Sequence, residues 1–254
     1  MALILSIDLA CRDYEDFGFC LLRKSSGKVV DIQYLDYRAL GLGGIPQADT
    51  FADRVLSFCL DTGISILMFD GPQGWKDPDN GLLHQRVCEK ELHTQAKTGV
   101  IGEVKPANFT SFVSFSIDVF SVLNRSGQLS LVTEPKIVLP LRGILLIETY
   151  PHSAWRKLGM RPLAGKKKCT PEQIAQQAAE LKRRFELPEA KSPTHDELSA
   201  LVAGLAGVAI TSDNVGGYIA SGAPPKLVPE DYIVEGYIVN PRLSPAQFDL
   251  GGRG

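Results

Sequence analysis

Short apolar runs that each end near an acidic residue are the main pattern along this 254-residue chain. LILSIDL reaches Asp8, ISILMFDGP reaches Asp70, and GILLIETYP contains Glu148 close to its end. Runs of this length, rich in Leu and Ile and bounded by turn residues, are typical of strands buried on both faces. The pattern therefore predicts three buried strands, each carrying a carboxylate at its carboxyl end.

The segments between these runs predict how the strands are connected. Residues 17–23 and 29–37 are predicted strands around the turn KSSGK, which with the first strand gives a three-stranded meander. After Pro46, apolar residues recur at helical spacing as far as Gly63, which predicts a crossover helix. Strands joined by such a helix are expected to be parallel neighbours, so Asp8 and Asp70 should lie at the same sheet edge.

The second half of the chain predicts more helices and a final strand. We expect helices over residues 82–94, 111–124, from about 171, and from about 195 to 210, with capping boxes at Thr170 and Thr194. Residues 232–239 are predicted to form a terminal hairpin or edge strand, followed by a loose tail from about 241. Because no repeat or low-complexity linker interrupts the chain, we expect one α/β domain spanning residues 1–254.

The last helix has two different faces. Its large apolar residues share one face, whereas small residues share the opposite face with Asp196. The small face should permit close approach to the sheet and bring Asp196 over the strand ends. Glu197 instead fits a capping box with Thr194, and we exclude it from the site on that ground.

Composition limits the partners. A formal charge of −2 gives no whole-protein attraction to nucleic acid, so such binding would need a local basic face. Lys166, Lys167 and Lys168 form one candidate, although a solvated loop explains them equally well. The five scattered cysteines indicate reduced thiols in a cytosolic protein, and we expect neither a signal peptide nor a membrane span.

Carboxylates gathered at one place repel each other unless cations lie among them. Asp8, Asp70, Glu148 and Asp196 are therefore interpreted as one site for Mg²⁺ or Mn²⁺, which prefer carboxylate oxygen and water. Two such ions can activate water and stabilise the leaving oxygen of a phosphodiester. Taken singly, each acid is more simply explained as a cap, turn residue or ion-pair partner.

The ordered motifs IDLA, FDGP, RVCEKEL, IETYP, HDELSALVAGLAG and EGYIVNP cover most of the chain. In order and spacing they resemble an uncharacterised family of predicted RNase H-like nucleases, domain of unknown function four-two-nine. The resemblance implies a ribonuclease H-like mixed sheet with flanking helices, and Asp8, Asp70, Glu148 and Asp196 as its acidic positions. It also implies that Arg86 faces a phosphate and is held by Glu91, although a surface helix ion pair is the simpler interpretation. Ser199 stands where related sequences often have a further acid, which puts activity in question.

The leading hypothesis is metal-dependent hydrolysis of nucleic-acid phosphodiester bonds by a positioned water. A non-catalytic RNase H-like binding or scaffold protein is the alternative, favoured by the near-neutral charge and by Ser199. An actin-like phosphotransferase is disfavoured because IDLACRDYEDFG lacks the glycines of a phosphate loop. His152 and His195 are either proton carriers or ordinary histidines, and Tyr150 and Trp155 either stack on a base or belong to the core.

Overall fold

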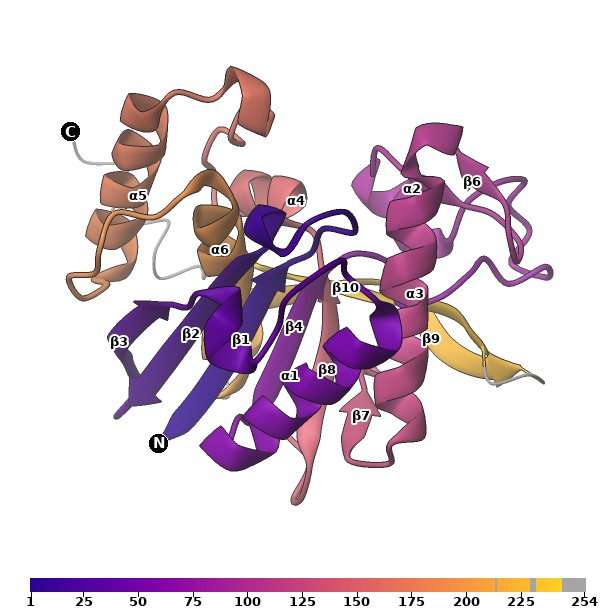
Figure 1. The fold of residues 1–254 in the computed structure, drawn as a ribbon, viewed down its shortest axis with the longest axis horizontal. Coiled ribbons are helices and arrows are strands. Elements are labelled where there is room, and N and C mark those ends of the chain that lie inside the picture. The colour runs from indigo at the N-terminus through magenta and orange to yellow at the C-terminus, as the bar shows by residue number, and fades with distance from the viewer. Residues whose placement is uncertain (213, 229–231, 244–254) are drawn as a thin grey trace.

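The computed structural model describes residues 1–212, 214–228 and 232–243, and its centre is an eight-stranded mixed sheet (Figure 1). The strand order is β3-β2-β1-β4-β8-β10-β9, with the short β7 also paired to β8. The strands are β1 (Ala2–Asp8), β2 (Gly18–Ser25), β3 (Lys28–Tyr34), β4 (Ile66–Asp70), β7 (Leu129–Leu131), β8 (Ile144–Thr149), β9 (Tyr218–Val228) and β10 (Tyr232–Pro241). A separate small sheet pairs β5 (Lys97–Thr98) with β6 (Val104–Lys105).

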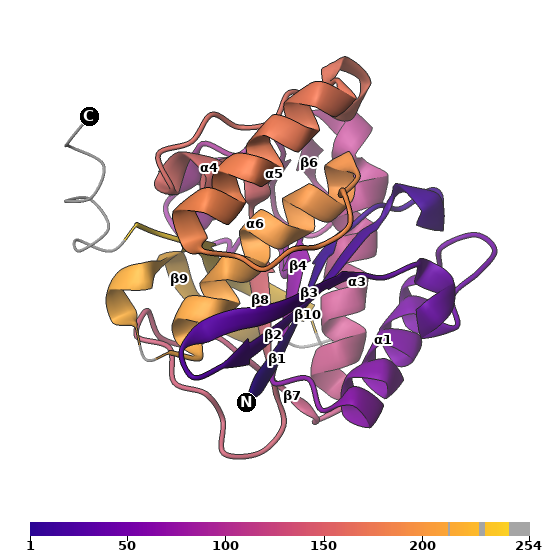
Figure 2. The same cartoon turned by 90° about the vertical axis from the view of Figure 1, so that its left-hand side faces the viewer.

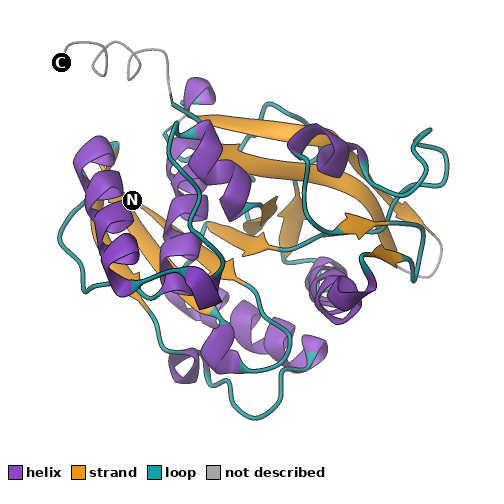
Figure 3. Ribbon diagram, turned by 90° about the horizontal axis from the view of Figure 1, so that it is seen from above, coloured by secondary structure: helices purple, strands orange, loops and turns teal. Residues whose placement is uncertain are grey.

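The strand directions follow from the connections. The first three strands form the expected antiparallel meander, whereas β4 and β8 are reached through helices and run parallel to β1. The expected mixed sheet with flanking helices is confirmed. β10 forms the expected terminal hairpin with β9. It lies between β8 and β9, so β9 and not β10 takes the edge of the sheet. Figure 3 shows the sheet and the surrounding helices from above.

Helices cover both faces of the sheet (Figure 2). The longer helices are α1 (Ala48–Thr62), α3 (Thr110–Arg125), α5 (Pro171–Phe185) and α6 (His195–Ile210), and the shorter ones are α2 (Val87–Leu92) and α4 (Pro151–Lys157). One core joins Leu5 and Phe69 of the sheet to Phe51 of α1, and the other joins Ile4 and Met68 to α6. Alternate residues of β1 and β4 thus bury apolar area on opposite faces, as their continuous apolar runs predict.

The packing of α6 on the sheet depends on small residues. A Cβ at Gly207 would come within 2.8 Å of Ile4, and one at Gly18 on β2 would come within 2.1 Å of the Asp196 backbone. Thr194 accepts a hydrogen bond from the Glu197 backbone N–H and Glu197 accepts one from Thr194, so the expected capping box is confirmed. Close packing and the cap together hold the first turn of α6 above the end of β1.

Helix α2 is shorter than the helix that the sequence predicts over 82–94. Arg86 is its N-cap, and His93 ends it in the left-handed conformation. The expected tail from about 241 falls mainly on residues 244–254, which lie outside the described residues. Within the described ranges, no helix has the length and apolar character that crossing a membrane requires.

Candidate functional site

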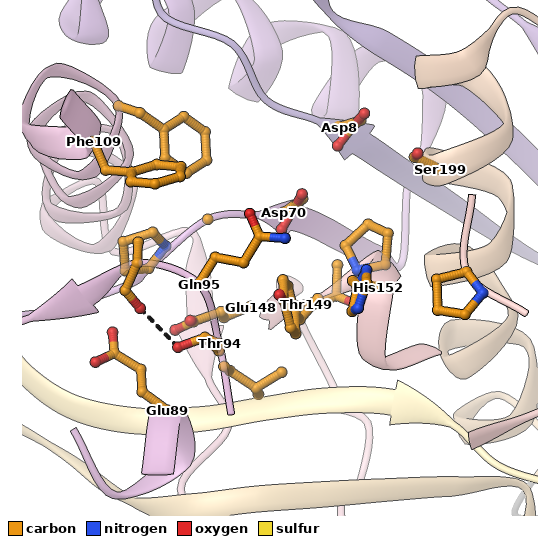
Figure 4. A pocket seen from close by; sticks show the side chains of 18 of the residues that line it. Asp8, Asp70, Glu89, Thr94, Gln95, Phe109, Glu148, Thr149, His152 and Ser199 are labelled. Carbon is orange, nitrogen blue, oxygen red and sulfur yellow. Dashed lines mark hydrogen bonds between the residues drawn. The ribbon is translucent and has the colours of Figure 1, made fainter. Parts of the chain in front are cut away.

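Asp8 and Asp70 lie side by side at the carboxyl ends of the two central parallel strands. The register of β1 and β4 pairs Asp8 directly with Asp70, and protonated Asp8 donates a hydrogen bond to the Asp70 carboxylate. Both residues line a cavity of about 650 Å³, shown in Figure 4. The sequence-based expectation that these two acids share one sheet edge is met by this geometry.

The two carboxyl groups do not ionise easily. Burial, followed by the charges of Asp70 and Asp196, raises the pKa of Asp8 well above its usual range. Burial also raises the pKa of Asp70 to about 7, to which the charge of Glu148 contributes while the hydrogen bond from Asp8 opposes it. The pair therefore retains a proton near neutral pH unless another positive charge replaces it.

Glu148 lines the same cavity but faces different partners. The register pairs Asp70 with Thr149 and Phe69 with Glu148, so Glu148 is one residue out of step with the aspartate pair. Its two oxygens accept hydrogen bonds from the Arg86 guanidinium at 2.7 and 2.8 Å, and one also accepts the Gln73 backbone N–H at 2.9 Å. A buried carboxylate engaged in this way is already neutralised by the protein.

Arg86 is paired with two buried carboxylates. Its side chain is 1% exposed, and its guanidinium donates to Glu148 and Glu89. These bonds engage the guanidinium, and Arg86 also lines the cavity. That Arg86 faces a phosphate stays a prediction. The carboxylate that holds it is Glu89, not Glu91, since Glu89 lies three residues along α2 and also accepts the Arg86 backbone N–H.

Asp196 lies above the pair on α6 and is also engaged by cations. One of its oxygens accepts from Lys166 Nζ at 2.6 Å, and the other lies 3.0 Å from His195 Nδ1. Burial would raise the pKa of Asp196, but the hydrogen bonds with His195 and Lys166 hold it below its usual value. Lys166 also contacts Asp16 at 2.7 Å, whereas Lys167 and Lys168 are exposed.

His195 is the histidine tied into this group. The hydrogen bond with Asp196 raises the pKa of His195 against the effect of burial, and its Nε2 lies 3.0 Å from the Ala164 carbonyl. His152 also lines the cavity, but burial and then Arg156 lower its pKa. Trp155 is 1% exposed and belongs to the core, while Tyr150 stays partly exposed at the cavity wall.

A closed metal site of three or more ligands is not formed among the residues that the structure describes. Asp8 and Asp70 contact each other, Asp196 is close enough to affect the pKa of Asp8, and Glu148 is turned to Arg86. Two adjacent carboxylates with raised pKa values fit an oxygen-preferring divalent cation, which would replace the proton they hold. That Glu148 and Asp196 also bind metal stays a prediction.

Sequence reasoning missed part of the cavity. Thr149 stands beside Asp70 in the register, and its buried hydroxyl finds no hydrogen-bond partner in the described part of the chain. Gln95 and Phe109 also line the cavity, from the loop after α2 and from the short turn just before α3. The apolar-acid pattern that revealed the strand ends carries no signal for these loop residues.

Comparisons with known proteins give structural neighbours only. The T. thermophilus RuvC in complex with Holliday junction substrate is 12% identical, with a TM-score of 0.37 over 84% of this chain and 98% of that chain. A Thermus thermophilus RuvC structure is 10% identical, with a TM-score of 0.35 over 82% of this chain and 95% of that chain. No family model and no curated protein matches the chain, so membership of domain of unknown function four-two-nine stays a prediction.

Proposed function

We propose that this protein is a divalent-metal-dependent nuclease that hydrolyses nucleic-acid phosphodiester bonds with Mg²⁺ or Mn²⁺ at Asp8 and Asp70. The observation that carries the proposal is the contact between these two buried carboxyl groups. They lie at the carboxyl ends of two parallel strands and line one cavity. An acid pair of this kind costs folding free energy, which a bound cation offsets.

The residues around the pair have separate tasks in this proposal. Asp8 and Asp70 hold the cation, which when bound stabilises the charge that develops on the phosphate. Asp196 and the Ala164 carbonyl engage the two ring nitrogens of His195 and raise its pKa, so the protonated ring would place a positive charge beside the phosphate. Lys166 holds Asp196 ionised and links it to Asp16.

A non-catalytic nucleic-acid-binding protein is the second candidate. Two acids that could complete a metal site, Glu148 and Asp196, are instead paired with Arg86 and Lys166. Acidic residues that are neutralised by positively charged side chains of the protein can keep their arrangement without a metal ion. On this alternative the cavity binds its ligand without cleaving it.

Calorimetric titration with Mn²⁺, together with cleavage assays on single-stranded, duplex and four-way-junction DNA and on RNA, tests the proposal. The wild type should bind Mn²⁺ and cleave at least one substrate, and Asp8→Asn should abolish both while keeping its fold. Asp61→Asn, an exposed aspartate at the end of α1, is the matched control and should keep both. Nucleic-acid binding without Mn²⁺ binding or cleavage would favour the second candidate.

A further inference from the structure

Beside the acid pair, the cavity has a wall of aromatic rings and unpaired polar groups. We propose that this wall binds one unpaired nucleobase, so that the substrate presents a single nucleotide with its base out of any duplex. This inference rests on the proposed nuclease function, since it places the attached phosphate near Asp8 and Asp70. It identifies the class of substrate that the cavity accepts.

The aromatic part of the wall comes from Phe109 and Phe112. They lie at the end of the short helix η3 (Ala107–Phe109) and in the first turn of α3, both line the cavity, and both are only partly buried. Figure 4 shows Phe109 across the cavity from His152, with Asp70 between them. Aromatic rings that leave a face open inside a cavity are stacking platforms for bases.

Polar groups complete the wall. Gln95 reaches into the cavity between Asp70 and Thr94, and among the described residues nothing hydrogen-bonds its side-chain amide (Figure 4). Thr98 and Thr149 line the same cavity, and each has a buried hydroxyl without a partner in the described part of the chain. A buried hydroxyl left unpaired costs free energy, which a ligand offering donors and acceptors would recover.

Tyr150 fixes the place of Gln95. Its hydroxyl oxygen accepts a hydrogen bond from the Gln95 backbone N–H, and burial and then the charge of Asp70 raise the pKa of Tyr150. The loop that carries Gln95 is thereby held close to the acid pair. An amide presents both a donor and an acceptor, the combination that reads the edge of a base.

Size and charge argue against a duplex at this place. A cavity of about 650 Å³ matches a small-molecule pocket and holds a nucleotide unit, whereas a double helix cannot enter it. The net charge of −2 also gives no whole-protein attraction to the dense phosphate charge of a duplex. A free nucleotide and an unpaired nucleotide within a strand share the same recognition chemistry, and binding experiments separate them.

The test measures binding in EDTA, without metal and without turnover. The full chain is titrated with adenosine monophosphate, with a short single-stranded oligonucleotide and with a blunt duplex of the same sequence. We expect binding of one or both of the first two and at least about tenfold weaker binding of the duplex. Binding of adenosine monophosphate alone would identify a free nucleotide as the ligand, and binding of the strand alone would identify an unpaired nucleotide in a polymer.

Two variants address the wall directly. Phe109→Ala should weaken binding by about fivefold or more, as removal of one stacking partner does. Gln95→Leu keeps the size of an exposed side chain and should weaken binding or change base preference without affecting the fold. Phe58→Ala, a partly buried phenylalanine of α1 outside the cavity, is the matched control and should keep wild-type affinity.

The outcomes separate this inference from the proposed function. Equal affinity for duplex and single strand, no binding of either unpaired probe, or unchanged affinity in both Phe109→Ala and Gln95→Leu would overturn the base site. Asp8→Asn should lose Mn²⁺ binding but keep nucleotide binding in EDTA. If the wild type fails to bind Mn²⁺ while the wall variants lose nucleotide affinity, the nuclease proposal fails and the base site stands.

Discussion

At the scale of single residues, the proton shared by Asp8 and Asp70 makes stability depend on pH. Burial raises the folded-state pKa of Asp70 to about 7, above the value of about 3.9 expected in the unfolded chain. Between these pH values the folded state holds more protons, so the free energy of unfolding falls as pH rises from about 4 to about 7. Asp70→Asn should therefore be more stable than the wild type above pH 7. Its free energy of unfolding should fall less steeply between about pH 4 and about pH 7.

Urea denaturation across this pH range in EDTA measures the effect. Asp61→Asn should keep the wild-type slope, because that aspartate is exposed. Added Mn²⁺ should stabilise the wild type and leave Asp70→Asn unchanged. An identical pH slope in Asp70→Asn and wild type would show that the pair does not share a proton.

Two neighbouring acids of α6 should behave differently. Glu197→Ala removes one half of the capping box and should cost about 1 kcal/mol of stability while Mn²⁺ affinity is kept. Asp196→Ala should lower Mn²⁺ affinity, because Asp196 is close enough to Asp8 to affect its pKa. Mn²⁺ calorimetry and urea denaturation of both variants check these two expectations. Lost Mn²⁺ affinity in Glu197→Ala with unchanged affinity in Asp196→Ala would show that Glu197, and not Asp196, belongs to the metal site.

At the scale of elements, the crossing of α6 over β2 decides where Asp196 stands. Gly18→Ala would place a Cβ 2.1 Å from the Asp196 carbonyl oxygen, which is backbone and cannot turn aside. The first turn of α6 must then move, and we expect a loss of about 1–3 kcal/mol together with weaker Mn²⁺ binding. Gly43→Ala is the control, since a Cβ there meets no described atom within 4 Å; similar losses in both variants would contradict this expectation.

The buried acid Glu235 holds the segment between β4 and α3 in place. Glu235 on β10 is 2% exposed and accepts the backbone N–H groups of Asp77 and Val87 and the amide of Asn80. Glu235→Ala should leave these donors unpaired, at a cost of about 1–3 kcal/mol for each buried one. Hydrogen exchange should then rise in residues 73–87 before the sheet is affected, and uniform exchange across the chain would contradict this.

At the scale of the whole molecule, binding of a polymer must rely on local charge. Lys167 and Lys168 are exposed beside Lys166, which is already paired with Asp16 and Asp196. Replacing Lys167 and Lys168 with Gln should weaken oligonucleotide binding and reduce its logarithmic salt slope, by about 0.7 for each single-strand phosphate that a lysine no longer neutralises. Lys90→Gln, at an exposed position of α2, is the control. An unchanged salt slope in the double variant would show that the lysine cluster is a solvated loop without phosphate contacts.

Local patterns in the sequence determined strands β1 to β4, β8 and β10, the crossover helix and the sheet edge shared by Asp8 and Asp70. They did so because burial on both faces requires continuous apolar runs, and because a helical crossover makes the joined strands parallel neighbours. The capping boxes at Thr170 and Thr194 were equally predictable, since each depends on side chains three residues apart.

Only the tertiary structure decided the partners of the other acids. A one-residue difference in register set Glu148 beside Phe69, where Arg86 from a distant segment neutralises it. Lys166 reached Asp196 across 30 residues of chain, and Phe109 of η3 and Gln95 of the loop after α2 met in one cavity. Such contacts depend on strand register and on long-range packing, and neither leaves a periodic signal in the sequence.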